Sequence, residues 1–276
     1  MINNRITKVI CLPPTSDKNP YQHLMINGLK KNEKLKVIKG FSSRHIGIIL
    51  SSIIYMPKYV HFDWINKYYL KKNSISTAIS SSWFLFQIYF ITIVLRIKVV
   101  WTMHNISPHD SNQIRLNKIV QQKFINQCKW VRVFSQLTIK KLKNIYSIDN
   151  TKKIIAVPEG SYVNYYQNNI SRKDAKKKLG IKNKKIFLYI GTIKPYKGII
   201  DLISTFIEIN HNNVKLIIAG KVVDKNYLDK INKLIKNNNS IVLINKFIAP
   251  NDLQIFFNAT DVVILPFKNI ENSGSA

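Results

Sequence analysis

Cysteine and recognisable metal-binding patterns are scarce in this sequence of 276 residues. The two cysteines, Cys11 and Cys128, are too few and too far apart to form a zinc site or a disulfide framework. No H-E-x-x-H or D-x-D pattern occurs either, so the sequence has no visible set of metal ligands. We therefore expect a protein of a reducing compartment that uses no metal ion and no other cofactor.

The nine glycines do not form the common phosphate-binding patterns. Neither G-x-G-x-x-G nor G-x-x-x-x-G-K-[ST] is present, which argues against the usual dinucleotide-dependent oxidoreductases and P-loop enzymes. The nucleophile elbow G-x-S-x-G is also missing, which argues against hydrolases of that type.

Acidic residues are few, because 14 Asp and Glu stand against 43 Lys and Arg, for a formal net charge of +29. Such an excess is typical of proteins that bind nucleic acids or anionic membranes. Only six of the cations are arginine, the residue that favours bidentate binding of bases and phosphates. The lysines accompany abundant Ile and Asn along the whole chain, as in proteins from A/T-rich genomes. Among charged partners we expect an anionic membrane surface, and no nucleic acid.

One uncharged segment, residues 75–95, is long enough to suggest a transmembrane helix. Its first third is rich in Ser and Thr, and it continues directly into an apparent core strand at residues 99–103. A buried or interfacial helix over residues 77–96 is therefore the expectation, with a membrane span as the alternative. The N-terminus has too short an apolar run before Pro13 for a signal peptide.

Short β-forming runs alternate with longer helical patterns, which predicts an α/β fold with parallel sheets and crossover helices. The predicted strands cover residues 8–12, 36–39, 59–61, 99–103, 131–134, 153–157, 186–190, 214–219, 241–244 and 262–265. The predicted helices cover residues 21–31, 44–55, 77–96, 111–127, 137–146, 172–179, 198–209, 225–236 and 251–257, the last with Asn251 as its N-cap. A polar interruption predicts an N-terminal domain at 1–160, a linker at 161–170 and a C-terminal domain at 171–276.

Polar residues gather at the predicted carboxyl ends of strands, where open α/β sheets bind ligands. In the first half, His61 and Asp63 end the third strand, and His104 follows the fourth. In the second half, the loop at residues 191–198 combines two glycines, two lysines and a helix N-terminus, which together suit a diphosphate. Each cluster alone is explained equally well by packed or solvated side chains, but their equivalent positions favour a ligand site.

These stretches resemble the family 4-like nucleotide-sugar glycosyltransferases of the GT-B type. The resemblance is strongest to the bacterial branch that builds exopolysaccharides, capsules and lipid-linked glycans. It is carried by N-P-Y-Q at 19–22, H-F-D-W at 61–64, W-T-M-H-N at 101–105, P-H at 108–109, the loop at 191–198, A-G-K at 219–221, D-V-V-I-L-P-F at 261–267 and N-S-G-S at 272–275.

The resemblance implies two Rossmann-like domains facing across a cleft, the second incomplete, and transfer of a sugar from a nucleotide diphosphate sugar to a glycan or lipid-linked acceptor. It implies donor binding by Gly191, Lys194, Lys197, Glu271, Ser273, Gly274 and Ser275. It implies acceptor-side roles for Asn19, Tyr21, His61, Asn105, His109 and Glu159. The expected catalytic residues are His104, which would contact the donor sugar or phosphate, and Asp63, a candidate base if the enzyme inverts.

Three positions depart from the family pattern. Asp63 stands where the second His of H-x-H-W is usual, and Thr192 replaces an Arg that often follows the loop glycine. Glu271 matches only the first carboxylate of the E-x7-E motif, so we expect a chain cut short in its second domain.

Two other functions remain open at this stage. One is a non-catalytic remnant or partner subunit of a glycosyltransferase. The other is a basic α/β protein that binds nucleic acid or an acidic polymer, which would gather its lysines into one stripe. For the glycosyltransferase, a lipid-linked acceptor implies a peripheral protein on the cytoplasmic face of the cell membrane.

Overall fold

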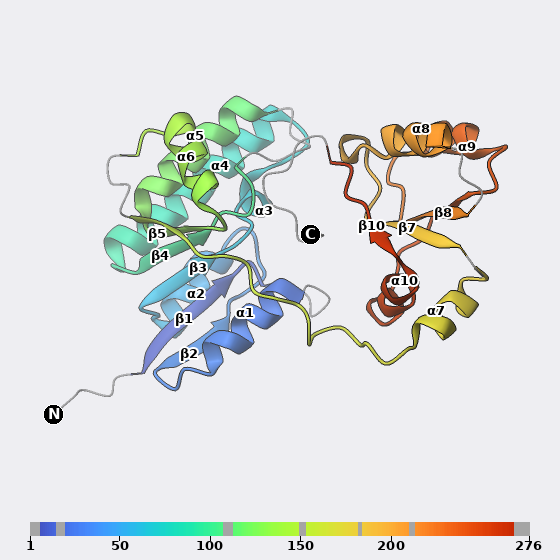
Figure 1. The fold of residues 1–276 in the computed structure, drawn as a ribbon. Coiled ribbons are helices and arrows are strands. Elements are labelled where there is room, and N and C mark those ends of the chain that lie inside the picture. Colours follow the sequence, from blue (N-terminus) through green and yellow to red (C-terminus); the bar gives the residue numbers. More distant parts are fainter. Residues whose placement is uncertain are drawn as a thin grey trace. The chain divides into compact units, whose positions relative to one another are not determined.

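The computed structural model describes residues 6–14, 20–106, 113–148, 153–181, 184–209 and 213–267. The chain divides into two compact units, Met1–Gly160 and Ser161–Ala276, and residues 161–170 belong to the second of them. Each unit is built on one parallel sheet (Figure 1).

The sheet of the first unit has six strands in the order β2-β1-β3-β4-β5-β6. They are β1 (Thr7–Leu12), β2 (Leu35–Lys39), β3 (Tyr59–Phe62), β4 (Lys98–Thr102), β5 (Cys128–Val133) and β6 (Ile154–Ala156). All neighbouring pairs are parallel, so the residues that follow β1, β3, β4 and β5 meet at one edge of the sheet.

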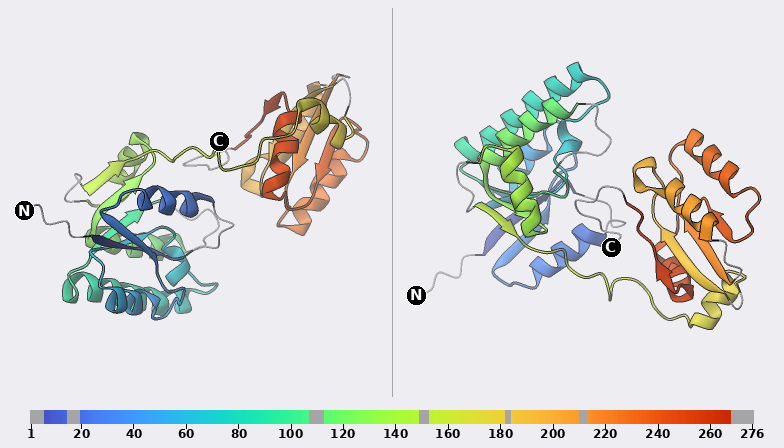
Figure 2. Two further views of the ribbon diagram at one scale, coloured as in Figure 1. Left: turned by 90° about the horizontal axis from the view of Figure 1, so that it is seen from below. Right: turned by 45° about the horizontal axis from the view of Figure 1, so that its top comes forward.

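The helices of the first unit include one that is unusually apolar. They are α1 (Pro20–Lys30), α2 (Gly47–Tyr55), α3 (Asn66–Tyr69), α4 (Ser74–Tyr89), α5 (Ile114–Gln127) and α6 (Gln136–Ile145), and α4 continues into a π-helical turn, η1 (Phe90–Val94). Helix α1 lies on one face of the sheet, whereas α2 and α4 pack side by side on the other (Figure 2). Ser74–Val94 is long and apolar enough to cross a membrane. Of its most apolar 18-residue stretch, 33% is buried inside the protein.

Aromatic side chains form the centre of this unit's core. Phe62 of β3, Phe84 of α4 and Phe124 of α5 are at most 1% exposed, and the Phe124 ring lies 5.4 Å from each of the other two. Trp101 of β4 packs against Phe124 with its ring centroid at 5.3 Å. The sheet and the α4–α5 layer are therefore fixed relative to each other by large, buried rings.

The second unit contains a four-stranded parallel sheet in the order β10-β7-β8-β9. Its strands are β7 (Lys185–Ile190), β8 (Val214–Ala219), β9 (Ile241–Ile244) and β10 (Val262–Val263), and its helices are α7 (Arg172–Lys178), α8 (Ile199–Ile209), α9 (Lys225–Ile235) and α10 (Leu253–Ala259). Leu216 and Ile218 of β8 face one core cluster, whereas Ile217 and Ala219 face another. Burial on both faces explains why this strand is apolar without alternation.

The sequence pattern located most elements, with three informative differences. The helix predicted at 77–96 begins at Ser74, because the Asn73 side chain caps it by accepting a hydrogen bond from the Ser76 backbone N–H at 2.7 Å. Helix α3 was not predicted, since four residues are too few to show a period. The cap expected from Asn251 was wrong: this residue lies in a 3-10 turn, η4 (Pro250–Asp252), that precedes α10.

Candidate active site

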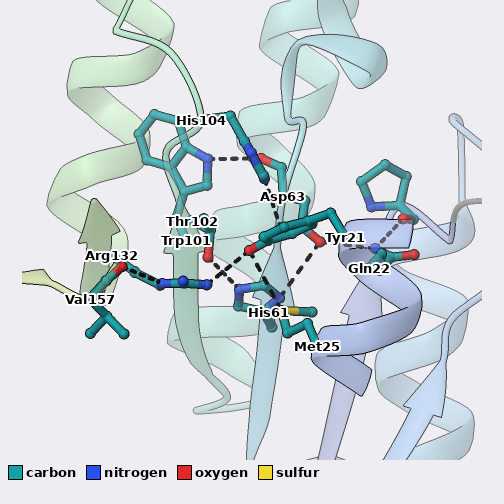
Figure 3. A network of polar contacts seen from close by, with 11 residues as sticks. Tyr21, Gln22, Met25, His61, Asp63, Trp101, Thr102, His104, Arg132 and Val157 are labelled. Atoms are coloured by element: carbon teal, nitrogen blue, oxygen red, sulfur yellow. Dashed lines mark hydrogen bonds and ion pairs between the residues drawn. The ribbon is translucent and has the colours of Figure 1, made fainter. Parts of the chain in front are cut away.

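Side chains from α1, β3 and β4 converge at the carboxyl edge of the first sheet (Figure 3). Asp63 follows β3, His104 lies two residues beyond β4, and Tyr21 comes from the first turn of α1. The parallel strands bring His61, Asp63 and His104 together although 41 residues separate Asp63 from His104. The sequence-based prediction that these three side chains share one edge is consistent with this geometry.

Asp63 is a buried carboxylate with a partner for each oxygen. It is 1% exposed; Oδ1 lies 3.2 Å from His104 Nε2, and Oδ2 accepts a hydrogen bond from Gln22 Nε2 at 2.9 Å. Burial raises the pKa of Asp63, but His61, His104 and Gln22 more than offset this effect and hold the pKa below its usual range. Asp63 is therefore ionised and shielded, an arrangement that suits a group orienting His104 better than a base that must reach an acceptor.

His104 is held on both faces by aromatic rings. Its imidazole stacks on Trp64 with ring centroids 4.4 Å apart, and the Tyr21 ring meets it edge-on at 4.7 Å. The His104 side chain keeps 16% of its surface exposed. Because an ionised carboxylate can only accept, Nε2 of His104 carries the proton that faces Asp63. The orientation and the tautomer of the His104 imidazole are thus set before any ligand binds.

Arg132, on β5, connects α1 to the chain beyond β6. Its guanidinium donates to Tyr21 Oη at 2.9 Å and to the carbonyl oxygens of Val157 and Pro158 at 3.1 and 2.7 Å. Sequence reasoning missed Arg132, although an arginine inside an apolar strand of a chain with so few arginines was a usable signal. It also missed Gln22 and Trp64.

His61 lies deeper than its predicted acceptor-side role requires. Its side chain is 10% exposed, and Nε2 pairs with Thr102 Oγ1 at 2.9 Å. Burial lowers the pKa of His61 by more than the nearby Asp63 raises it. In this position His61 packs beside the Asp63 carboxylate and helps to hold it in place.

The remaining first-unit candidates are only partly described. Asn105 lines a small cavity of about 50 Å³ together with Asp63, Trp64 and His104, which is room for a water molecule or two. Glu159 is partly exposed beyond β6. Asn19 and His109 lie outside the described residues.

The second unit places its candidate loop where β7 ends and α8 begins. Gly191 and Gly198 both have positive φ, 137° and 70°. A Cβ on Gly198 would lie 2.1 Å from the carbonyl oxygen of Pro266, so the loop packs directly on the chain that follows β10. Only glycine fits this position.

Two lysines lie in this loop beside the start of α8. Lys194 precedes a 3-10 turn, η3 (Pro195–Lys197), and the Lys197 ammonium lies 5.3 Å from the centre of the Phe267 ring. Burial lowers the pKa of Lys197, and the charge on Lys194 lowers it further. A pair of partly desolvated cations at a helix start favours an anionic ligand. The other predicted donor residues, Glu271, Ser273, Gly274 and Ser275, lie outside the described residues.

Residues 171–276 match the model of the family described as "Glycosyl transferases group 1". This match covers most of the second unit. The expectation of a glycosyltransferase, drawn from stretches along nearly the whole chain, is confirmed at this level. No curated protein matches the sequence significantly.

Several solved structures share the fold of both units. HepE of Anabaena in complex with UDP and glucose is 15% identical, with a TM-score of 0.63 over 93% of this chain and 73% of that one. A glycosyltransferase from Rickettsia africae is 17% identical, with a TM-score of 0.62 over 94% and 72%. MnaA of S. aureus with UDP is 10% identical, with a TM-score of 0.56 over 93% and 73%. At these identities the likeness establishes the fold, and the predicted GT-B type α/β fold is confirmed.

Proposed function

We propose that this protein transfers a sugar from a nucleotide diphosphate sugar to a glycan or lipid-linked acceptor in the synthesis of a cell-surface polysaccharide. The match of residues 171–276 to the group 1 family carries the proposal. Two similar structures contain UDP, one of them together with glucose, which supports a nucleotide sugar as the donor.

The second unit supplies the donor site in this proposal. When the sugar leaves, negative charge develops on the nucleoside diphosphate. Lys194, Lys197 and the backbone N–H groups at the start of α8 are placed to stabilise that charge without a metal ion. Gly191, with a positive φ, lets the backbone turn at the start of this loop.

The first unit supplies His104 and the acceptor side. The proton on His104 Nε2 faces Asp63, and the ring packs against Trp64 and Tyr21, so the imidazole is oriented in advance to contact a hydroxyl of the donor sugar. Asp63 acts here through His104 as a positioning residue.

Donor binding tests the assignment of the loop. Calorimetry with UDP, GDP and ADP should identify a nucleotide that binds the protein. The Lys197→Ala variant should weaken that binding by about 1.5–3 kcal/mol, the range for a hydrogen bond to a charged group. Lys225→Ala, at the start of α9, is the matched control and should leave the affinity unchanged. Unchanged affinity in Lys197→Ala, or no binding of any nucleoside diphosphate, would contradict the donor site.

A further inference from the structure

Helices α2 and α4 expose apolar side chains and bury polar ones. On α4, Ile79 is 68% and Phe86 53% exposed, whereas Thr77, Ser81 and Gln87 are buried. On α2, Leu50, Ile53 and Ile54 are exposed, whereas Ser51 and Ser52 are buried. A helix on the surface of a soluble protein normally shows the opposite pattern.

These side chains belong to one surface, which we call the α2–α4 face. It comprises Ile46, Leu50, Ile53, Ile54 and Met56 around α2, and Ile75, Ile79, Trp83, Phe86, Ile93 and Val94 along α4 and η1. The two helices pack against each other, and the Trp83 indole N–H donates to the His45 carbonyl just before α2. A continuous apolar surface of this kind marks an interaction site.

Charge surrounds the face and is of one sign. No lysine, arginine or acidic residue occurs between Lys72 and Arg96 or between Arg44 and Lys58, so cations flank both helices at both ends. Between Glu33 and Asp110 the only carboxylate is Asp63, which is buried. A second copy of this chain would bring like charges together, whereas an anionic lipid surface would attract them.

We infer that the α2–α4 face docks on an anionic lipid bilayer, with its apolar side chains at the level of the headgroups and the flanking lysines and arginines on the lipid phosphates. Trp83 suits this position, because indoles favour the boundary between water and hydrocarbon. The helix lies on the bilayer and does not cross it. Phe84, Ile88 and Ile91 on its other side are at most 1% exposed in the core, and the chain continues at once into β4, between β3 and β5.

Docking on lipid does not depend on the proposed glycosyl transfer, so its test needs no sugar donor. The full chain should sediment with vesicles that contain about one third phosphatidylglycerol and be released by high salt. It should not sediment with vesicles of phosphatidylcholine alone. The double variant Ile79→Ser/Phe86→Ser should bind the anionic vesicles at least tenfold more weakly.

Two comparisons separate docking from a general loss of structure. The matched control Ile119→Ser/Leu137→Ser removes two equally exposed apolar side chains from α5 and α6 and should bind like the parent. Ile53→Ser/Ile54→Ser changes the same face through α2 and should weaken binding as the α4 variant does. Brominated anionic lipid should quench the fluorescence of the parent, and Trp83→Phe should lose most of that quenching.

Three results would overturn the inference. Equal vesicle binding by parent and both face variants would place the contact elsewhere. Retention on neutral vesicles in high salt would indicate a membrane-embedded helix. A dimer that forms without lipid, and that light scattering shows to be lost in Phe86→Ser, would assign the face to a second copy of the chain.

Discussion

At the scale of single residues, Asp63 organises the first-unit site. It accepts from Gln22 on α1, faces His104 beyond β4, and its own backbone carbonyl accepts from the Trp101 indole at 3.0 Å. One residue thereby joins a helix and two strands. Its burial without hydrogen-bond partners would be costly, so the network and the charge depend on each other.

The pH dependence of stability tests this arrangement. The pKa of Asp63 in the folded protein lies below the unfolded value of about 3.9, so its contribution is complete above that value and is lost as the pH falls toward the folded pKa. Urea unfolding should therefore show that the parent loses stability between about pH 5 and pH 2 more steeply than Asp63→Asn does.

An exposed carboxylate provides the comparison for that experiment. Asp229→Asn on α9 leaves Asp63 in place and should follow the parent's curve. Parallel curves for the parent and Asp63→Asn would mean that the carboxylate gains nothing from its neighbours in the folded state.

The sequence predicted the strand-end residues of this site and missed their partners. His61, Asp63 and His104 follow β-rich runs, and parallel strands must bring such residues to one edge. Gln22 reaches the same place from a helix and Arg132 from the interior of a strand. The hydrophobic period of a helix or strand does not identify polar side chains of this kind. The burial of Asp63 was not predicted either, because burial is a property of the packed fold.

At the scale of elements, the β7–α8 loop shows how backbone geometry positions a site. Gly198 ends the 3-10 turn in the left-handed region and touches the carbonyl of Pro266 beyond β10. The β7–α8 loop and the segment after β10 can therefore pack together only because residue 198 has no side chain. The glycine spacing that identifies better-known phosphate loops is absent, so the loop was found from its lysines and its position between strand and helix.

Two glycines with almost equal φ allow the steric contribution to be measured. Gly180 has φ of 67° and open space around it, whereas Gly198 has φ of 70° and the Pro266 carbonyl in the way. Gly180→Ala should cost about 1–2 kcal/mol, the price of the left-handed conformation alone. Gly198→Ala should cost clearly more, as measured by the midpoint of thermal or urea unfolding. Equal costs would show that the loop does not pack against the β10 segment in solution.

Helix α4 illustrates what composition alone does not resolve. Its length and apolarity fit a membrane span, whereas its Ser and Thr residues favoured a buried or interfacial helix. In the structure one side of the helix, which includes Phe84, Ile88 and Ser81, faces the core, and the other side exposes Ile79 and Phe86. Periodicity identified the helix, but it could not say which face the sheet would cover.

At the scale of the whole molecule, the α/β pattern was legible because each strand is a short, buried run between helical stretches. The two parallel sheets and their core clusters follow from that alternation. The identity of donor and acceptor is not legible in this way, because it depends on a few hydrogen bonds in a site whose residues come from distant parts of the chain.

Turnover tests the central claim most directly. The purified protein is incubated with nucleotide diphosphate sugars and a bacterial lipid and glycan extract, and released nucleoside diphosphate is measured together with labelled sugar joined to acceptor. We predict equal amounts of both from one donor. His104→Ala should lose most of this activity at an unchanged melting temperature, while the control His23→Ala on α1 keeps it. Binding of a nucleoside diphosphate without transfer from any donor would contradict the account and make the protein a non-catalytic relative of the group 1 glycosyltransferases.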